Sequence, residues 1–173
     1  MQKIILASQS PRRKQLLQWA EIDFDVEVSA ADESFPQHLS VEEIPIFIAR
    51  NKAKAVQQKN KSNAIILAAD TIVVLQNEVI NKPEDRDEAI KILQSLSGKQ
   101  HQVITGVVLL QNKKEISFAD VTQVEFHELT NDQIIFYVDK YKPYDKAGAY
   151  AIQEWIGVIG IKSISGDFYN VMG

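Results

Sequence analysis

The sequence predicts an α/β protein in which a mixed, strongly twisted sheet is flanked by helices. Two patterns support this fold class: strand-like and helix-like segments alternate at first, and strands then follow one another directly. With 173 residues, 45% of them hydrophobic, the chain suffices for one domain with a sizeable core or for two closely apposed lobes. We therefore expect residues 1–173 to form a single domain.

Local signals define the individual elements. Strands appear as short apolar or β-branched runs, and the longest run, Ile65–Leu75, is the expected centre of the sheet. Helices start where a capping residue precedes an apolar stripe. Such starts are Ser10 with Pro11, Ser40 with Glu43, Asp85 with Glu88, and Thr130 with Gln133. The predicted elements are, in order, strand 4–7, helix 10–20, strand 24–28, helix 40–59, strands 65–75 and 79–80, helix 85–97, strands 103–110 and 116–126, helix 130–141 and strand 159–164.

The charge balance and the lack of cysteine exclude several kinds of site. A formal net charge of −4 argues against general binding to nucleic acid or to an anionic membrane. Without cysteine there can be no disulfide and no thiolate catalysis, and the three histidines have no metal-ligand spacing. Any metal must therefore be held by oxygen. No apolar run is long enough for a secretory signal or a membrane span, so we expect a cytoplasmic protein.

Three cations, Arg12, Arg13 and Lys14, occupy the first turn of the first predicted helix. A helix N-terminus is already positive because its N–H groups are free, so these charges are misplaced unless an anion binds there. A strand that leads through Ser8 and Ser10 into such a helix start is suited to phosphate. The alternative is a solvated basic helix end with Ser10 as an ordinary cap.

Two further charges stand at positions that should face the core. Lys52 lies on the apolar stripe of its predicted helix, whereas Lys54 points away from it. Such a lysine either reaches an edge of the structure or serves an anion. Asp70 is the only charge within the strand Ile65–Leu75, and a buried carboxylate must be paired, bound to a metal or protonated. Asp70 is thus either a salt-bridge partner, of Lys52 or Lys82, or a metal ligand or general base.

A run of small residues, Ala147-Gly148-Ala149, is bracketed by polar groups. Small side chains allow a flat ligand or another backbone to approach closely. Gln153, which follows this run, could present its amide to the edge of a nucleotide base. The alternative is a tightly packed loop with a solvated glutamine.

Taken together, these features resemble the Maf family of nucleotide pyrophosphatases, also called septum-formation inhibitor proteins. The matching segments span almost the whole chain: Leu6–Arg13, Asp32-Glu33, the helix with Lys52, Ala68–Thr71, Asn81–Pro83, Leu96–Val107, Asp145–Tyr150, Gly166-Asp167 and Asn170-Val171. The resemblance implies an α/β fold with two lobes around a cleft, related to the inosine triphosphate pyrophosphatases, and members are often homodimers. One departure concerns Glu154, which stands where many relatives have glycine.

The resemblance also assigns roles to residues of this chain. It implies that Asp70 is the proton acceptor and that the phosphate and metal region is lined by Ser8, Arg13, Glu33, Lys52 and Lys82. It further implies that substrate choice is set by Arg12, Thr71 and Gln153. The form of the Asp145–Gln153 segment is similar to that of the subfamily acting on dTTP and UTP.

The expected activity is therefore hydrolysis of a nucleoside triphosphate, dTTP or UTP or a modified pyrimidine nucleotide, to the monophosphate and pyrophosphate. Water must attack the α-phosphorus while negative charge spreads over pyrophosphate, so the site needs a base, cationic side chains and a divalent cation, Mg²⁺ or Mn²⁺. Asp70 and Glu33 are the expected metal ligands. The alternative is a non-catalytic, nucleotide-binding regulator of cell division. No binding to nucleic acid or membrane is expected.

Overall fold

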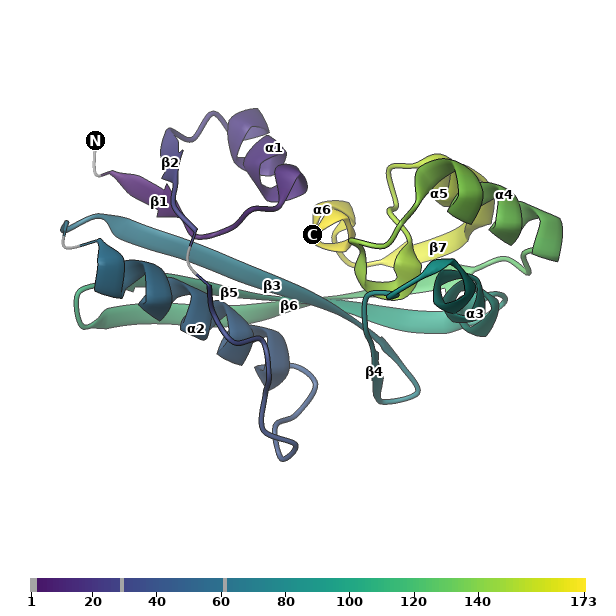
Figure 1. The fold of residues 1–173 in the computed structure, drawn as a ribbon, viewed down its shortest axis with the longest axis horizontal. Coiled ribbons are helices and arrows are strands. Elements are labelled where there is room, and N and C mark those ends of the chain that lie inside the picture. Colours follow the sequence, from purple (N-terminus) through teal and green to yellow (C-terminus); the bar gives the residue numbers. More distant parts are fainter. Residues whose placement is uncertain (1–2, 29, 61) are drawn as a thin grey trace. The chain divides into compact units, whose positions relative to one another are not determined.

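The computed structural model describes residues 3–28, 30–60 and 62–173 and contains the predicted mixture of strands and helices (Figure 1). The strands are β1 Ile4–Leu6, β2 Phe24–Val26, β3 Ile65–Leu75, β4 Glu78–Ile80, β5 Gln100–Gln111, β6 Lys114–Phe126 and β7 Ile161–Ser165. The helices are α1 Pro11–Trp19, α2 Glu43–Lys59, α3 Arg86–Leu96, α4 Asn131–Tyr141, the 3₁₀ helix η1 Ala147–Ala149, α5 Trp155–Gly160 and α6 Phe168–Met172.

One mixed sheet connects these strands within the described residues. Its strand order is β2-β1-β3-β5-β6-β7, and β4 pairs with β3. The strand β1 is parallel to both β2 and β3, whereas the pairs β3–β4 and β6–β7 are antiparallel. The turn between β3 and β4 consists of Gln76 and Asn77, both with positive φ, as a tight two-residue hairpin requires. The predicted fold class, α/β with a mixed sheet and flanking helices, is confirmed.

Most helix starts follow the capping signals of the sequence. Thr130 and Gln133 form a reciprocal capping box at α4, and the Asp85 carboxylate accepts the Glu88 N–H at α3. Ser40 and Glu43 also make their predicted reciprocal bonds, at 2.9 and 3.4 Å, but these lie in a turn, and α2 itself begins only at Glu43.

Four elements in the last third of the chain differ from the prediction. The predicted strand 159–164 begins at Ile161, because the preceding residues form the short helix α5. The helices η1, α5 and α6 were not predicted. Each of the three helices has six residues or fewer, which is too short for an apolar stripe to repeat.

The chain divides into two compact units. Unit 1 comprises residues 1–71, 105–120 and 173, and unit 2 comprises residues 72–104 and 121–172. The three long strands β3, β5 and β6 contribute residues to both units. Each unit is described separately below.

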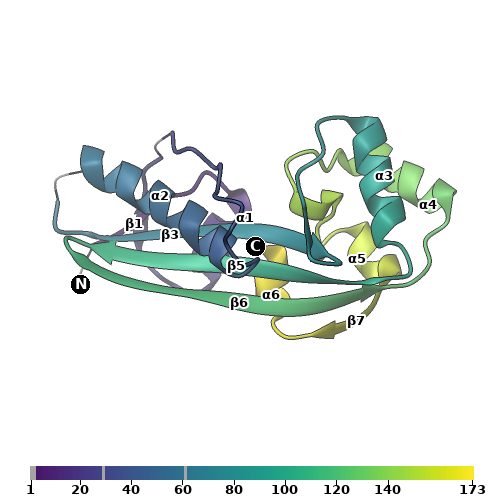
Figure 2. The ribbon, with the colours of Figure 1, turned by 90° about the horizontal axis from the view of Figure 1, so that it is seen from below.

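In unit 1, α2 packs on the sheet through its small and apolar face. Ala49, Ala53 and Val56 are buried against residues of β1, β3 and β5. Gly106 of β5 permits the close approach of this helix, because a Cβ atom there would lie 2.2 Å from the Ile46 nitrogen. Helix α1 lies on the other side of the strands from α2 (Figures 1 and 2).

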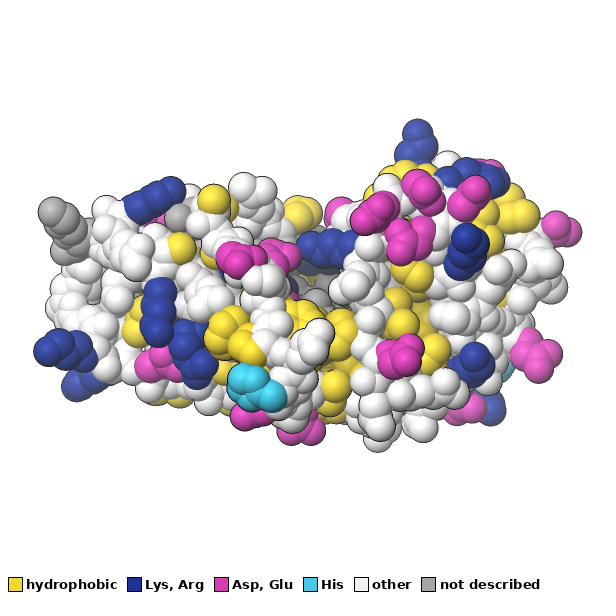
Figure 3. Space-filling view, turned by 60° about the horizontal axis from the view of Figure 1, so that its bottom comes forward, with side chains coloured by type: hydrophobic (Ala, Val, Ile, Leu, Met, Phe, Trp, Pro, Cys, Tyr) yellow, Lys and Arg dark blue, Asp and Glu magenta, His cyan; other side chains and the backbone are white. Residues whose placement is uncertain are grey.

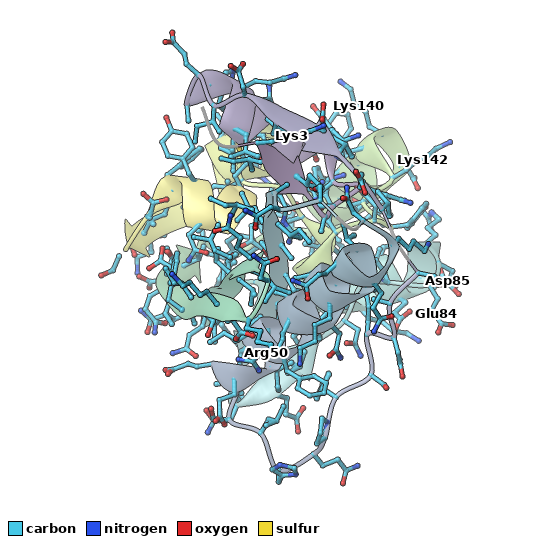
Figure 4. All side chains as sticks on the ribbon, turned by 90° about the vertical axis from the view of Figure 1, so that its left-hand side faces the viewer. Lys3, Arg50, Glu84, Asp85, Lys140 and Lys142 are labelled. Atoms are coloured by element: carbon cyan, nitrogen blue, oxygen red, sulfur yellow. The ribbon has the colours of Figure 1, made fainter. Side chains whose placement is uncertain are left out.

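The exposed side of α2 is fixed by an ion pair. Arg50, labelled in Figure 4, extends from α2, and its Nε–H donates to Glu115 Oε1 of β6 at 2.8 Å. More generally, Lys and Arg side chains lie among Asp and Glu side chains on the face shown in Figure 3. This mixture of signs agrees with the small net charge of the chain.

Unit 2 is built around α3 and α4, which pack against each other, and α3 also packs against η1. Its core contains the buried side chains Leu93, Leu96, Ile134, Tyr137 and Val138. The start of α3, where Asp85 is labelled in Figure 4, carries the cap described above.

Candidate active site

The segment between β1 and α1 is held in a fixed turn by two serines. The Ser8 side chain is buried, and its Oγ accepts the Ser10 N–H at 3.2 Å. Ser10 caps α1, since its Oγ faces the Arg13 N–H at 3.5 Å, and Pro11 occupies the first helical position. The predicted strand, turn and helix start are therefore present.

Arg13 points inward, toward β3. Its Nη1 donates to Ser8 Oγ at 3.3 Å and to the Ala69 carbonyl at 2.6 Å, and its Nη2 donates to Thr71 Oγ1 at 3.1 Å. Burial lowers the pKa of the guanidinium, and the nearby negative charge of Asp70 opposes this shift. The Nε–H is buried and has no hydrogen-bond partner. The alternative of a solvated basic helix end is thus wrong for Arg13.

Lys52 is paired with two carboxylates. Its Nζ lies 2.6 Å from Asp70 Oδ1 and 2.8 Å from Glu33 Oε1. The Lys52 and Asp70 side chains are only 18% and 14% exposed, whereas Glu33 is 55% exposed. Lys54, in contrast, is exposed, as the helical spacing predicts. The structure therefore contains the Asp70–Lys52 salt bridge that the sequence allowed, and it adds Glu33 to the same cluster.

The fit of a divalent cation depends on these two carboxylates. Among the residues that the structure describes, no group of three or more His, Asp or Glu side chains is placed to hold a metal. Asp70 and Glu33 nevertheless supply the oxygen ligands that Mg²⁺ and Mn²⁺ prefer, and Mg²⁺ commonly keeps several waters and binds substrate phosphate besides one or two carboxylates. The two residues fit such an ion in kind, with the remaining ligands coming from water and substrate.

Thr71 connects Arg13 to β5. Its Oγ1 accepts from Arg13 and lies 2.9 Å from Thr105 Oγ1. Arg12, the neighbouring residue predicted to affect substrate choice, is partly buried on α1. Seven predicted site residues belong to unit 1, and six of them are linked through β3 by hydrogen bonds and ion pairs: Ser8, Arg13, Glu33, Lys52, Asp70 and Thr71.

The other two predicted site residues, Lys82 and Gln153, belong to unit 2. Lys82 is exposed in the segment after β4, and Gln153 is exposed in the turn before α5. Gly148, in the middle of η1, has φ +70°, and a Cβ atom there would lie 2.9 Å from Val73 Cγ2. The small-residue run therefore serves close packing against β3 in this structure.

Buried side chains of unit 2 hold the segment that carries Gln153. The Tyr150 hydroxyl lies 2.7 Å from His101 Nε2, and burial lowers the pKa of His101 to about 4, so the imidazole is neutral near pH 7. The Tyr137 hydroxyl bonds to the backbone of Ala151 and to the Glu154 carboxylate. Only indirect signals in the sequence point to these last contacts: a tyrosine on the apolar stripe of α4 and the unusual Glu154.

The fold and site define an α/β protein with an arginine bonded to the long strand β3 and a lysine that pairs with two carboxylates, one on β3 and one in the loop before α2. The chain belongs to the Maf-like protein family, whose model matches residues 3–173. It is 51% identical over 172 residues to a Bacteroides thetaiotaomicron protein named dTTP/UTP pyrophosphatase, covering 99% of this chain and 89% of that protein. A protein of the same name from Cytophaga hutchinsonii is 50% identical over 170 residues, with 98% and 78% covered.

Comparison with solved structures supports the fold. The Staphylococcus aureus Ham1 protein aligns with a TM-score of 0.51 and 17% identity, covering 91% of this chain and 90% of that one. The two proteins share a fold at low sequence identity. None of the helices in the described parts of the chain has the length and apolar character needed to cross a membrane.

Proposed function

We propose that this chain hydrolyses dTTP and UTP, or modified forms of these pyrimidine nucleotides, to the monophosphate and pyrophosphate. The observation that carries the proposal is Asp70, a carboxylate on β3 that is ion-paired to Lys52, in a chain about half identical to proteins named dTTP/UTP pyrophosphatase. A protein that only binds nucleotide would need the cations but not this carboxylate. The alternative of a non-catalytic regulator of cell division is therefore not favoured.

The proposed reaction is attack of water on the α-phosphorus. The bond to the oxygen bridging the α- and β-phosphates breaks, its electron pair leaves with pyrophosphate, and the proton of the attacking water passes to a base. Asp70 serves as this base or orients the water, while Lys52 and Arg13 contribute positive charge beside it. A divalent cation, when bound by Asp70 and Glu33, would neutralise phosphate charge. Ser8 completes the proposed phosphate site of unit 1, and the resemblance assigns a phosphate-binding role to Lys82 as well.

The family resemblance supports further parts of the proposal. These are a requirement for a divalent metal, a cytoplasmic location, a homodimer, and an influence of Arg12 and Thr71 on substrate choice.

The proposal is tested by measuring pyrophosphate release from a panel of triphosphates with Mg²⁺ or Mn²⁺. The panel contains UTP, dTTP, CTP, ATP, GTP and modified pyrimidine triphosphates. We expect UTP and dTTP to have the highest kcat/KM among the ordinary nucleotides, with a monophosphate and pyrophosphate as products. Tight nucleotide binding without pyrophosphate release would instead support the regulator.

Replacing Gln153 should alter base selection. Uracil and thymine have an N3–H donor between two carbonyl acceptors, so one amide can accept from N3 and donate to a neighbouring oxygen. We expect Gln153→Ala to lower kcat/KM for UTP and dTTP by roughly tenfold or more, and to change poor substrates much less. Steady-state kinetics on the same panel measure this effect. A uniform loss across all triphosphates would place Gln153 in the catalytic framework instead.

A further inference from the structure

The turn that carries Gln153 is closed on a single hydroxyl group. The Tyr137 hydroxyl accepts the Ala151 N–H at 3.1 Å and donates its own proton to Glu154 Oε2. The Glu154 N–H in turn donates to the Ala151 carbonyl at 3.1 Å. Both ends of the four-residue turn 151–154 are therefore bonded to one oxygen atom, and Gln153 lies between them.

Tyr137, which anchors this turn, is held in place by burial and by ring stacking. Tyr137 is fully buried in α4, and its ring stacks on Tyr141 with the centroids 5.0 Å apart. Burial and the Glu154 carboxylate both raise the pKa of the Tyr137 hydroxyl, so it remains a proton donor. A buried hydroxyl that loses its acceptor is costly, which favours one arrangement of the turn.

Glu154 also ties the turn to the start of its own loop. The Lys146 Nζ lies 3.6 Å from Glu154 Oε1 and 2.8 Å from Asp145 Oδ1, and the Lys146 side chain is only 11% exposed. On the far side of the turn, a Cβ atom at Gly157 would lie 1.7 Å from the Ile152 carbonyl oxygen, so α5 packs directly against the turn. The backbone around Gln153 is thus restrained from both sides.

From this arrangement we infer that Glu154 and Tyr137 are positioning residues for base selection: they fix the backbone from which the exposed Gln153 side chain extends, and so the place at which its amide meets the base. The inference rests on the proposed function. Cytosine has an N3 acceptor and a 4-amino donor where uracil has an N3–H donor and a 4-carbonyl acceptor, so a displaced amide would lose the paired contact to uracil and with it the preference over CTP. Two other hydroxyl groups named above already have partners of their own. The Tyr150 hydroxyl is bonded to His101, and the Thr71 hydroxyl is bonded to Arg13 and Thr105.

The test compares the UTP to CTP ratio of kcat/KM in Tyr137→Phe, Glu154→Ala and Glu154→Gln. We expect the ratio to fall by about tenfold or more in Tyr137→Phe and Glu154→Ala. Glu154→Gln, which keeps an acceptor for the Tyr137 hydroxyl, should retain most of the ratio. Tyr141→Phe is the matched control, because it removes a hydroxyl from the same helix face one turn away, and it should leave the ratio unchanged. Hydrogen exchange of the Ala151 amide should accelerate in Tyr137→Phe, which removes the acceptor of that amide.

An unchanged ratio in a folded Glu154→Ala protein overturns the inference. An equal loss of kcat/KM for all triphosphates also overturns it, and so does a lower melting temperature with unchanged kcat/KM values. Either result would indicate a purely structural role. If Tyr137→Phe fails to fold, the comparison of Glu154→Ala with Glu154→Gln decides. A wild-type protein that does not prefer UTP to CTP overturns the proposed base preference itself, before any variant is compared.

Discussion

Asp70→Asn is expected to remove nearly all turnover. The substitution keeps the size of the side chain but deletes the proton acceptor and its charge, and general-base catalysis contributes about a hundredfold to ten-thousandfold. We therefore expect kcat to fall by at least about a hundredfold. Nucleotide affinity should stay within about tenfold, because Asp70 does not contact the nucleobase of the substrate in the proposed complex. Steady-state kinetics and the binding of a non-hydrolysable triphosphate analogue provide the two measurements.

The control for this prediction is Asp25→Asn. Asp25 is an exposed carboxylate of β2 in the same unit, paired at the surface with Lys3 at 2.6 Å. Surface pairs of this kind contribute little, so the control should retain normal kinetics. Near-normal turnover in Asp70→Asn would remove Asp70 from the catalytic machinery and leave only its salt bridge with Lys52.

Lys52→Ala is expected to have the second largest effect. In the structure Lys52 is the cation shared by Asp70 and Glu33, and the proposed reaction brings further negative charge to the same place. Its loss removes the cation that Asp70 and Glu33 share, and it removes positive charge from the transition state. We expect kcat/KM for UTP to fall by about a hundredfold.

Lys54→Ala serves as the matched control for Lys52→Ala. Both lysines belong to α2, but Lys54 is exposed. Its removal should change kcat/KM by less than about twofold, as expected for a surface substitution. If the two variants lost activity equally, the cause would be the net charge of the helix rather than the ion pair, and the assignment of Lys52 would be wrong.

Local chemistry explains why much of the fold could be predicted. Caps such as Thr130 with Gln133 act within four residues, and the β-branched run Ile65–Leu75 became β3 with the same bounds. The helix α5 was missed because its six residues are too few for an apolar stripe to repeat, and because Gly157, whose backbone approaches Ile152 too closely for any side chain, is part of it. Such a contact depends on the folded loop and leaves no periodic pattern.

The site was predictable where a residue violated a local pattern. Lys52 on an apolar stripe and Asp70 in an apolar strand were both identified in this way, and the structure pairs them. The role of Glu33 in the cluster came only from the family resemblance, because the segment around it has no helical or strand periodicity. The inward direction of Arg13 could not be predicted, since its partners Ala69 and Thr71 are 56 and 58 positions away in the chain.

The hydroxyl of Thr71 has a consequence for how substrate choice can change. It accepts from Arg13 and lies 2.9 Å from the Thr105 hydroxyl, so a predicted specificity residue and a predicted phosphate residue are joined by a hydrogen bond. A side chain without a hydroxyl at position 71 would also remove the acceptor of Arg13 Nη2. An engineer who wishes to redirect the enzyme to another nucleotide would therefore have to redesign positions 13, 71 and 105 as a set. A natural substitution at position 71 alone would weaken the binding of every triphosphate.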